Sequence, residues 1–276
     1  MNDVNGRPLS GEDYKEPQCL LNMHPEIRPI PAGRVIEKLD QHLSRNDWSA
    51  AERHLRYWLA EAESSGDARG RLTVLNEMIG LYRKMNRGQE CLQAVADALA
   101  LADGMEIGGT VSYGTTLINA ATGYRAFGRT EEALKLYRGA RSIYETCLQP
   151  DDERLGGLYN NMAVTLSGLK EYREAEALYH KAIGVMRKQA GGEPEIAVTL
   201  LNLADLTEAE AGPENGAERI DGYLAEAEAL LDTEGLPRDG HYAFVCEKCA
   251  PVFGHYGWFA AEQELKRRAG EIYERA

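Results

Sequence analysis

Residues 158–182 read LYNNMAVTLSGLKEYREAEALYHKA and contain two helix-like patterns separated by a short break. In the first pattern, apolar residues follow the i, i+3, i+4, i+7 spacing of one helical face at Tyr159, Met162, Ala163 and Leu166. The break covers residues 168–171, and the same kind of spacing returns at Ala175, Leu178, Tyr179 and Ala182. Polar residues interleave throughout, which excludes a fully buried strand. The segment therefore predicts a pair of helices joined by a tight turn.

The pair pattern recurs along the chain with a period of 42 residues. Residues 124–133 lie 42 positions before residues 166–175 and 42 positions after residues 82–91, and looser copies surround residues 46–52 and 257–262. A fixed period of this length indicates a repeat architecture. Since one helix pair cannot bury its apolar stripe alone, neighbouring pairs must stack. We expect one domain of six copies, over about 33–65, 68–104, 109–148, 151–190, 193–234 and 238–275.

The repeated residues resemble the tetratricopeptide repeat family in its 42-residue, kinesin-light-chain-like variety. The carrying residues are a small residue in the first helix (Ala121, Ala163, Ala204), an aromatic residue or leucine three later (Tyr124, Leu166), and an alanine in the second helix (Ala51, Ala133, Ala175, Ala261). The resemblance covers roughly residues 33–275. It implies an all-α, right-handed solenoid of about six helix pairs.

Three segments depart from the repeat. Residues 1–32 contain five prolines and little periodicity, which predicts an extended N-terminal arm. This arm could pack over the first helices, occupy the groove of this chain or a neighbour, or be disordered. About four extra residues at 211–216 predict a widened loop in copy five. Pro251 is expected to kink or shorten the first helix of copy six.

Composition limits the classes of function. The 276 residues include 31 basic and 44 acidic side chains, a net charge of −13, which argues against binding nucleic acid through bulk charge. No stretch approaches the roughly 20 apolar residues of a membrane span. The first residues, MNDVNGR, lack a signal-peptide pattern, and five scattered cysteines do not form a disulfide framework. We expect a cytoplasmic protein with neither nucleic acid nor membrane as a partner.

The resemblance also implies a concave groove lined by the first helix of every pair. The position two before the small residue faces this groove and reads Glu37, Glu77, Asn119, Asn161, Asn202 and Glu247. Asparagine amides offer donors and an acceptor together, and in kinesin-light-chain-like repeats they contact bound peptide. The alternative is that they join neighbouring helices within the groove wall. The expected peptide-binding set is Asn76, Glu77, Arg83, Lys84, Asn119, Thr122, Arg125, Asn160, Asn161, Asn202 and Asp205.

Charges divide this wall into two parts. Arg83, Lys84 and Arg125 make it basic toward its N-terminal middle, whereas Asp205 and Glu208 make it acidic toward the C-terminal end. Arginine can clamp a carboxylate through two parallel hydrogen bonds. We therefore predict an extended peptide whose acidic part meets the three cations; the alternative is an ordinary solvated helix face.

Residues that could support chemistry are few. Cys246 and Cys249, with His241 and His255 nearby, are ligand types that zinc accepts. However, Cys249 occupies the small-residue position of the repeat, where a compact side chain packs well. Phosphate-binding, zinc-hydrolase and nucleophile-elbow motifs are missing from the sequence. We expect no catalytic residue, no metal and no cofactor.

The sequence is therefore interpreted as a non-catalytic scaffold that binds a protein or an extended peptide in its concave groove. Two alternatives remain. The array could be a structural protein that assembles into a homo-oligomer. It could instead be a peptide-sensing regulator that resembles the repeat domains of bacterial quorum-peptide receptors but lacks their DNA-binding helices.

Overall fold

The computed structural model describes residues 28–275, and within this range the chain is all-α, with twelve helices and no strand. The helices are α1 (Ala32–Leu43), α2 (Trp48–Ser64), α3 (Ala68–Lys84), α4 (Gly88–Gly104), α5 (Val111–Ala126), α6 (Thr130–Cys147), α7 (Glu153–Gly168), α8 (Tyr172–Met186), α9 (Glu193–Ala211), α10 (Pro213–Leu231), α11 (Gly240–His255) and α12 (Phe259–Arg275).

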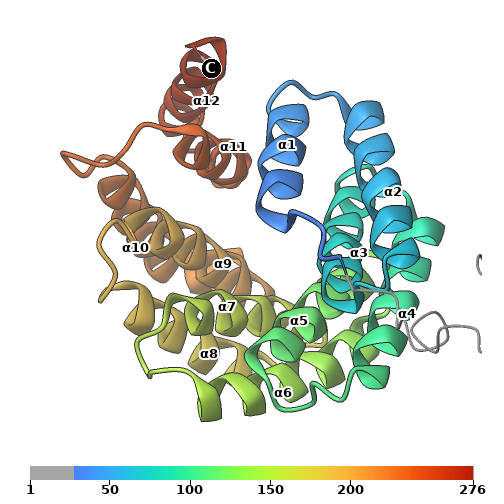
Figure 1. Cartoon of the computed structure of the whole chain (residues 1–276). Helices are drawn as coiled ribbons and strands as arrows, with labels where there is room; N and C mark the ends of the chain where they lie inside the picture. The colour runs from blue at the N-terminus through green and yellow to red at the C-terminus, as the bar shows by residue number, and fades with distance from the viewer. Residues whose placement is uncertain (1–27, 276) are drawn as a thin grey trace, which may run out of the picture.

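The helices form six antiparallel pairs that stack into a strongly curved array (Figure 1). Successive odd-numbered helices contact one another from α3 through α11, so they form the inner wall, and the even-numbered helices lie outside. The first helix, α1, and the last pair, α11 and α12, lie opposite each other across the opening of the array. The predicted all-α solenoid of six helix pairs is confirmed.

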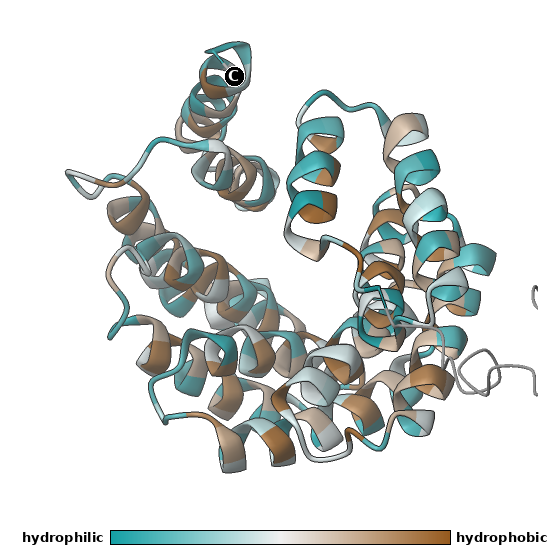
Figure 2. Cartoon of the chain, in the orientation of Figure 1, coloured by the Kyte–Doolittle hydropathy of each residue, from teal (hydrophilic) through white to brown (hydrophobic). Residues whose placement is uncertain are grey.

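Small residues and buried tyrosines pack together in the central pairs. Ala163 of α7 and Ala175 of α8 are completely buried, as the close approach of two helices requires. Tyr137 of α6 is also fully buried, and its hydroxyl lies 2.9 Å from Thr122 Oγ1 on α5. Figure 2 shows hydrophobic and hydrophilic stretches alternating along the helices. Burial therefore follows the alternation of small and large residues in the repeat.

Each pair turns through one residue with a positive φ angle: Asn46, Asn86, Gly128, Lys170, Gly212 and Gly257. Glycine and asparagine adopt this left-handed conformation readily, whereas other residues do so at a cost. Lys170, with a φ of 63°, is the exception among these six turns.

We predict that Lys170→Gly raises the free energy of unfolding by about 1 kcal/mol, because it relieves the left-handed strain. Gly128→Ala, at the same position one copy earlier with a φ of 80°, should lower it by a similar amount. Urea unfolding followed by circular dichroism measures both. A lower free energy of unfolding in Lys170→Gly would show that the lysine side chain stabilises the fold by more than its left-handed backbone destabilises it.

One detail of the sequence prediction is wrong, and a second is contradicted in part. The extra residues of copy five do not widen a loop: α9 continues to Ala211 and α10 begins at Pro213, with Gly212 alone between them. Gly212 permits this because its φ is 82° and proline is favourable in the first turn of a helix. Pro251 does not shorten α11, which continues to His255. The alternative, that Pro251 kinks this helix, stays a prediction.

The predicted arm, residues 1–32, lies outside the described residues except for its last five. Within those, the Ile30 side chain is buried and its backbone N–H donates to Asp67 Oδ2 at 2.8 Å. Asp67 also caps α3 by accepting the Gly70 N–H at 2.9 Å. One buried carboxylate thus joins the segment before α1 to the start of α3.

Candidate functional site

The inner wall of the array, formed by the odd-numbered helices and called the concave groove below, contains a cluster of positive charges. Arg83 lies in the last turn of α3, Arg125 in the last turn of α5, and Lys248 in the middle of α11. Desolvation lowers the pKa of Lys248, and the positive charges of Arg125 and Arg83 lower it further. The two arginines act on the charge of Lys248 although α7 and α9 separate α11 from α3 and α5 in the stack. We call the three residues the cation cluster.

The cation cluster is not neutralised by the chain itself. Among residues 28–275, none of its three members forms an ion pair with a carboxylate, and Lys84 beside Arg83 forms none either. The Nε atom of Arg125 is buried without a hydrogen-bond acceptor in this part of the chain. Elsewhere arginines pair closely, as Arg87 does with Glu52 at 2.6 Å. The groove therefore offers positive charge that remains available to a ligand.

The asparagines of the groove form two hydrogen-bonded pairs between successive inner helices. Asn119 Nδ2 donates to Asn76 Oδ1 at 3.2 Å, and Asn76 Nδ2 donates to Thr116 Oγ1 at 3.1 Å. Asn202 Nδ2 donates to Asn160 Oδ1 at 3.0 Å. We call each pair diagonal because its two members occupy different positions of the repeat. One asparagine stands two residues before the small residue of its own copy, and its partner stands three residues before the corresponding position of the previous copy. These four side chains connect α3 to α5 and α7 to α9.

Asn161 is different because its diagonal partner position is occupied by Ile118, which offers no acceptor. Its side-chain amide has no hydrogen-bond partner among the described residues, and it lines a pocket. Glu77 faces the same situation, with Ile36 at the diagonal position, and burial raises the pKa of its carboxyl. The amide of Asn161 therefore has donors and an acceptor available to a ligand, and the carboxyl group of Glu77 is available in the same way.

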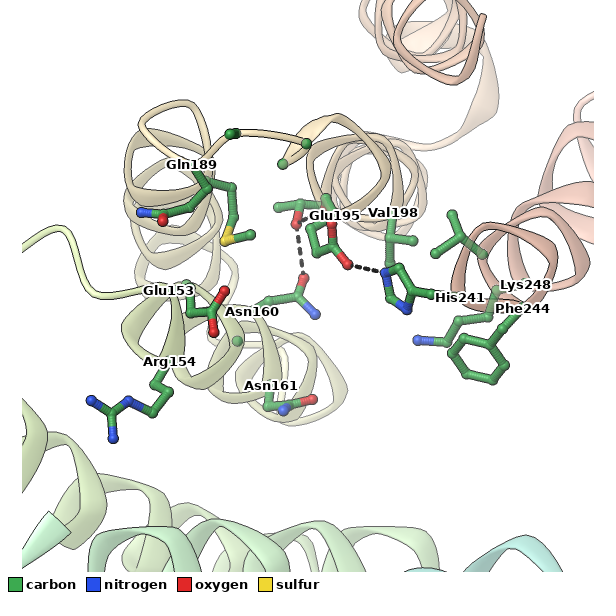
Figure 3. Close-up of a pocket in the computed structure, with 18 residues that line it drawn as sticks. Glu153, Arg154, Asn160, Asn161, Gln189, Glu195, Val198, His241, Phe244 and Lys248 are labelled. Atoms are coloured by element: carbon green, nitrogen blue, oxygen red, sulfur yellow. Dashed lines mark hydrogen bonds and ion pairs between the residues drawn. The ribbon is translucent and has the colours of Figure 1, made fainter. Parts of the chain in front are cut away.

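A pocket of about 530 Å³ opens at the N-terminal ends of α7, α9 and α11 (Figure 3). Asn161 and the bare backbone of Gly157 form one side, where an added Cβ atom would meet nothing within 4 Å. Phe244 and Lys248 of α11 line the opposite side, with the Lys248 amine 5.9 Å from the centroid of the Phe244 ring. Lys248 thus belongs both to the pocket and to the cation cluster, whereas Arg83 and Arg125 do not line the pocket.

Acidic groups and histidines join α9 to α11 along the same wall. Tyr256 donates its hydroxyl to Asp205 Oδ1 at 3.0 Å, and His255 Nε2 lies 3.0 Å from Glu208 Oε2. Burial raises the pKa of Asp205, partly offset by the hydrogen bond from Tyr256. These contacts give the predicted acidic end of the groove a role in holding the last helix pair.

The predicted site residues therefore fall into two groups. Those with a side-chain hydrogen bond to the described chain are Asn76, Asn119, Thr122, Asn160, Asn202 and Asp205. Those without an ion pair or side-chain hydrogen bond to the described chain are Glu77, Arg83, Lys84, Arg125 and Asn161. Sequence reasoning missed Lys248 and Phe244. Both lie in copy six, which is displaced from the 42-residue frame, since His255 contacts Glu208, a residue 47 positions earlier.

Cys246 and Cys249 of α11 are both buried. Burial raises the pKa of Cys246 to about 11 and that of Cys249 to about 12, so both remain thiols at neutral pH. Among residues 28–275, no three His, Cys, Asp or Glu side chains are arranged to hold a metal ion. Both side chains belong to the hydrophobic core of this half of the array.

We predict that iodoacetamide at about pH 8 modifies exposed Cys147 faster than Cys246 or Cys249, by on the order of 100-fold. Thiolate is the reactive form, and the raised pKa leaves very little of it in the two buried groups. Peptide mass spectrometry over a time course measures the rates, with the urea-unfolded chain as the control in which they converge. Equal rates in the folded protein would contradict the burial of the pair.

None of the helices in the described chain has the length and apolar composition of a membrane span.

Comparisons with known proteins agree with this architecture. A tetratricopeptide repeat family model matches residues 114–153 and 156–190. No curated protein matches the sequence. Among solved structures, a Podospora anserina protein described as a kinesin light chain with nearly identical TPR-like repeats is 16% identical with a TM-score of 0.53, covering 74% of this chain and 96% of that one.

Two further solved structures are similar. BtubC (BKLC) from P. vanneervenii is 17% identical with a TM-score of 0.56, covering 84% of this chain and 91% of that one. NprR, a quorum sensor of B. thuringiensis, solved in complex with its cognate peptide NprX, is 15% identical with a TM-score of 0.56. That match covers 86% of this chain and 66% of NprR. At these identities the likeness shows the fold alone.

Proposed function

We propose that this chain, which matches a tetratricopeptide repeat family model over residues 114–153 and 156–190, binds an extended peptide, free or as part of a protein, in its concave groove without catalysing a reaction. The observation that carries this proposal is the set of polar groups on the inner wall that have no partner in the described chain. They are the amide of Asn161 and the charges of Arg83, Arg125 and Lys248.

These groups match the chemistry of a peptide. The Asn161 amide can pair with one peptide group of an extended backbone regardless of the side chain that it carries. The pocket beside it can take a side chain against the Phe244 ring. An acidic part of the same peptide would then reach Lys248 and continue to Arg125 and Arg83.

A second candidate function is a peptide-sensing regulator. NprR shares the fold and was solved with its cognate peptide NprX. In that case binding would change the way this chain acts on another protein. This candidate uses the same groove and the same contacts, so it differs from a scaffold in the consequence of binding.

We propose a non-catalytic role with neither nucleic acid nor membrane as a partner. The net charge of −13 disfavours phosphate backbones, and the unpaired cations lie inside the groove. The thiols of Cys246 and Cys249 are protonated at neutral pH, which removes them as nucleophiles.

Affinity capture from a lysate of the native cell tests the proposal with three baits. These are the wild type, Arg125→Ala combined with Asn161→Ala, and Arg219→Ala, whose side chain forms a surface ion pair with Glu176. All three are checked for native helicity.

A partner that wild type and Arg219→Ala retain and the groove variant loses would support the proposal. A partner retained by all three baits would overturn it in favour of another surface. Recovery of only the bait itself, with a mass that rises with concentration, would replace it by self-assembly into a homo-oligomer.

A further inference from the structure

Two adjacent glycines in the second turn of α7 differ in what surrounds them. A Cβ atom added to Gly156 would lie 2.6 Å from the sulfur of Met186 on α8, so the packing of this helix pair requires a glycine there. Gly157 is exposed, and apart from the adjoining backbone of α7 no atom of the described chain lies within 4 Å of such a Cβ atom. Glycine inside a helix destabilises it relative to alanine. Packing therefore explains Gly156 but does not explain Gly157.

The repeat itself shows what Gly157 lacks. Thr73 and Thr115 stand at the corresponding positions of copies two and three, at intervals of 42 residues, and Val198 stands at that of copy five. All three are β-branched, and the Thr115 hydroxyl lies 2.7 Å from that of Tyr144 on α6. Only copy four of these central copies has a bare backbone at this point. The missing side chain leaves free space on the wall of the pocket of about 530 Å³.

The opposite wall of this pocket presents an exposed aromatic ring. Phe244 of α11 is 47% exposed, and it lines the pocket together with Val245 of the same helix (Figure 3). Helix α9, which packs between α7 and α11, adds Val198 to the lining. Removing such apolar surface from water is favourable, and ligand pockets are lined mainly by apolar side chains with a few polar groups. The space beside Gly157 is therefore suited to an apolar ligand group.

A polar group follows one helical turn after each of these two surfaces. Asn161 stands four residues after Gly157 on α7, and Lys248 stands four residues after Phe244 on α11, so each shares a face with the residue before it. The Asn161 amide has no partner among the described residues, and within this part of the chain Lys248 forms no ion pair. Both pocket walls thus combine a surface for an apolar side chain with a group that can bond a peptide backbone.

We propose that Gly157 determines the specificity of the groove by admitting one large apolar side chain of the ligand, of leucine size or larger. This side chain packs between the α7 backbone at Gly157 and the Phe244 ring, while Asn161 and Lys248 bond polar groups of the backbone beside it. Threonine at the same position of copies two and three fills the equivalent space. The inference rests on the proposed function for the peptide that carries the side chain, and it identifies the residue of that peptide on which affinity depends.

The space is tested first without any peptide, using N-acetyl-leucinamide as the probe and N-acetyl-glycinamide as its control. The protein is labelled at its methionine and valine methyl groups, since Met186, Val198 and Val245 all line the pocket. In wild type, the leucine probe should shift the methyl resonances of Met186 and Val198 with a dissociation constant on the order of 1 mM. The glycine probe should leave them unchanged.

Gly157→Thr restores the side chain of copies two and three and should abolish these shifts over the same range of probe concentrations. Gly222→Thr is the matched control, because Gly222 is an exposed glycine of the outer helix α10 with equally open surroundings and no place in the pocket. Circular dichroism establishes native helicity in both variants. Equal shifts in wild type and Gly157→Thr would overturn the proposal, and so would equal shifts with both probes.

Gly157→Ala separates binding from stability. Alanine is the better helix former, so this variant and Gly222→Ala should each raise the thermal unfolding midpoint by about 2 °C. Gly157→Ala should nevertheless bind the leucine probe more weakly than wild type, whereas Gly222→Ala should bind it equally well. Damage to the fold cannot produce weaker binding in a more stable protein. Unchanged binding in Gly157→Ala, at a raised midpoint, would show that the ligand does not approach the α7 backbone.

Selection from a library of random peptides distinguishes this inference from the proposed function. Wild type should select peptides with a large apolar residue at one position, and alanine at that position should weaken binding at least about tenfold. In Gly157→Thr the same replacement should change affinity little, since the two changes remove one contact. If the leucine probe binds but no peptide is selected or captured, the apolar site stands and peptide binding fails. If a selected peptide binds wild type and Gly157→Thr equally well, the assignment of Gly157 fails and peptide binding stands.

Discussion

Replacing Arg125 and Asn161 together with alanine is expected to weaken binding of the groove ligand by about 100-fold, or about 2.8 kcal/mol. Arg125 supplies a charge-assisted hydrogen bond, for which losses of about 1.5–3 kcal/mol are typical. Asn161 supplies neutral hydrogen bonds of about 0.5–1.5 kcal/mol. Neither side chain has an ion pair or side-chain hydrogen bond in the described chain, so the loss arises in the complex. Isothermal titration with the captured ligand measures it.

Matched variants make this result specific to the two residues. Asn119→Ala removes an asparagine of the same row that already bonds Asn76, so it should change affinity less than Asn161→Ala does. Each single variant and the double variant together form a thermodynamic cycle, which separates independent contacts from coupled ones. Affinity unchanged in the double variant would remove this part of the groove from the binding surface.

The contrast between Asn119 and Asn161 shows how far the sequence can predict the site. The row of asparagines is visible in the repeat, but their pairing is diagonal and joins residues from two copies. Asn76 and Asn160 provide acceptors at the diagonal position, whereas Ile118 does not. Once the diagonal rule is known, the sequence alone identifies Asn161 as unpaired. The rule itself depends on how far each inner helix is shifted along its axis relative to the inner helix of the previous copy. The sequence of a single copy does not specify this shift.

Lys248 was beyond sequence reasoning for a different physical reason. Local patterns determine the helices and the small residues between them, but the curvature of the array accumulates over several interfaces. Only that accumulated rotation brings α11 opposite α3 and α5. Copy six is also displaced from the 42-residue frame, since His241 pairs with Glu195, 46 residues earlier. Its groove positions therefore cannot be transferred from the central copies.

Tyr137→Ala is expected to lower the free energy of unfolding by about 3–5 kcal/mol, the range for truncating a large buried aromatic residue. The side chain is fully buried in α6 and bonds Thr122 through its hydroxyl at 2.9 Å. Tyr137→Phe keeps the ring and should cost only about 1 kcal/mol for the lost hydrogen bond. Urea unfolding measures both, with Tyr57→Ala, which is 57% exposed, as a control expected within about 0.5 kcal/mol of wild type.

The same substitution should also weaken ligand binding, although Tyr137 is buried between α5 and α6. In a repeat array, stability depends on the interfaces between neighbouring copies, and Tyr137 lies in copy three, between those that contribute Arg83 and Lys248. A loosened third copy would change the accumulated curvature and separate the cation cluster. Binding weakened in Tyr137→Ala but kept in Tyr137→Phe would show that the groove depends on this packing. If Tyr137→Ala is destabilised but binds the ligand with full affinity, the ligand does not need contacts on both sides of copy three.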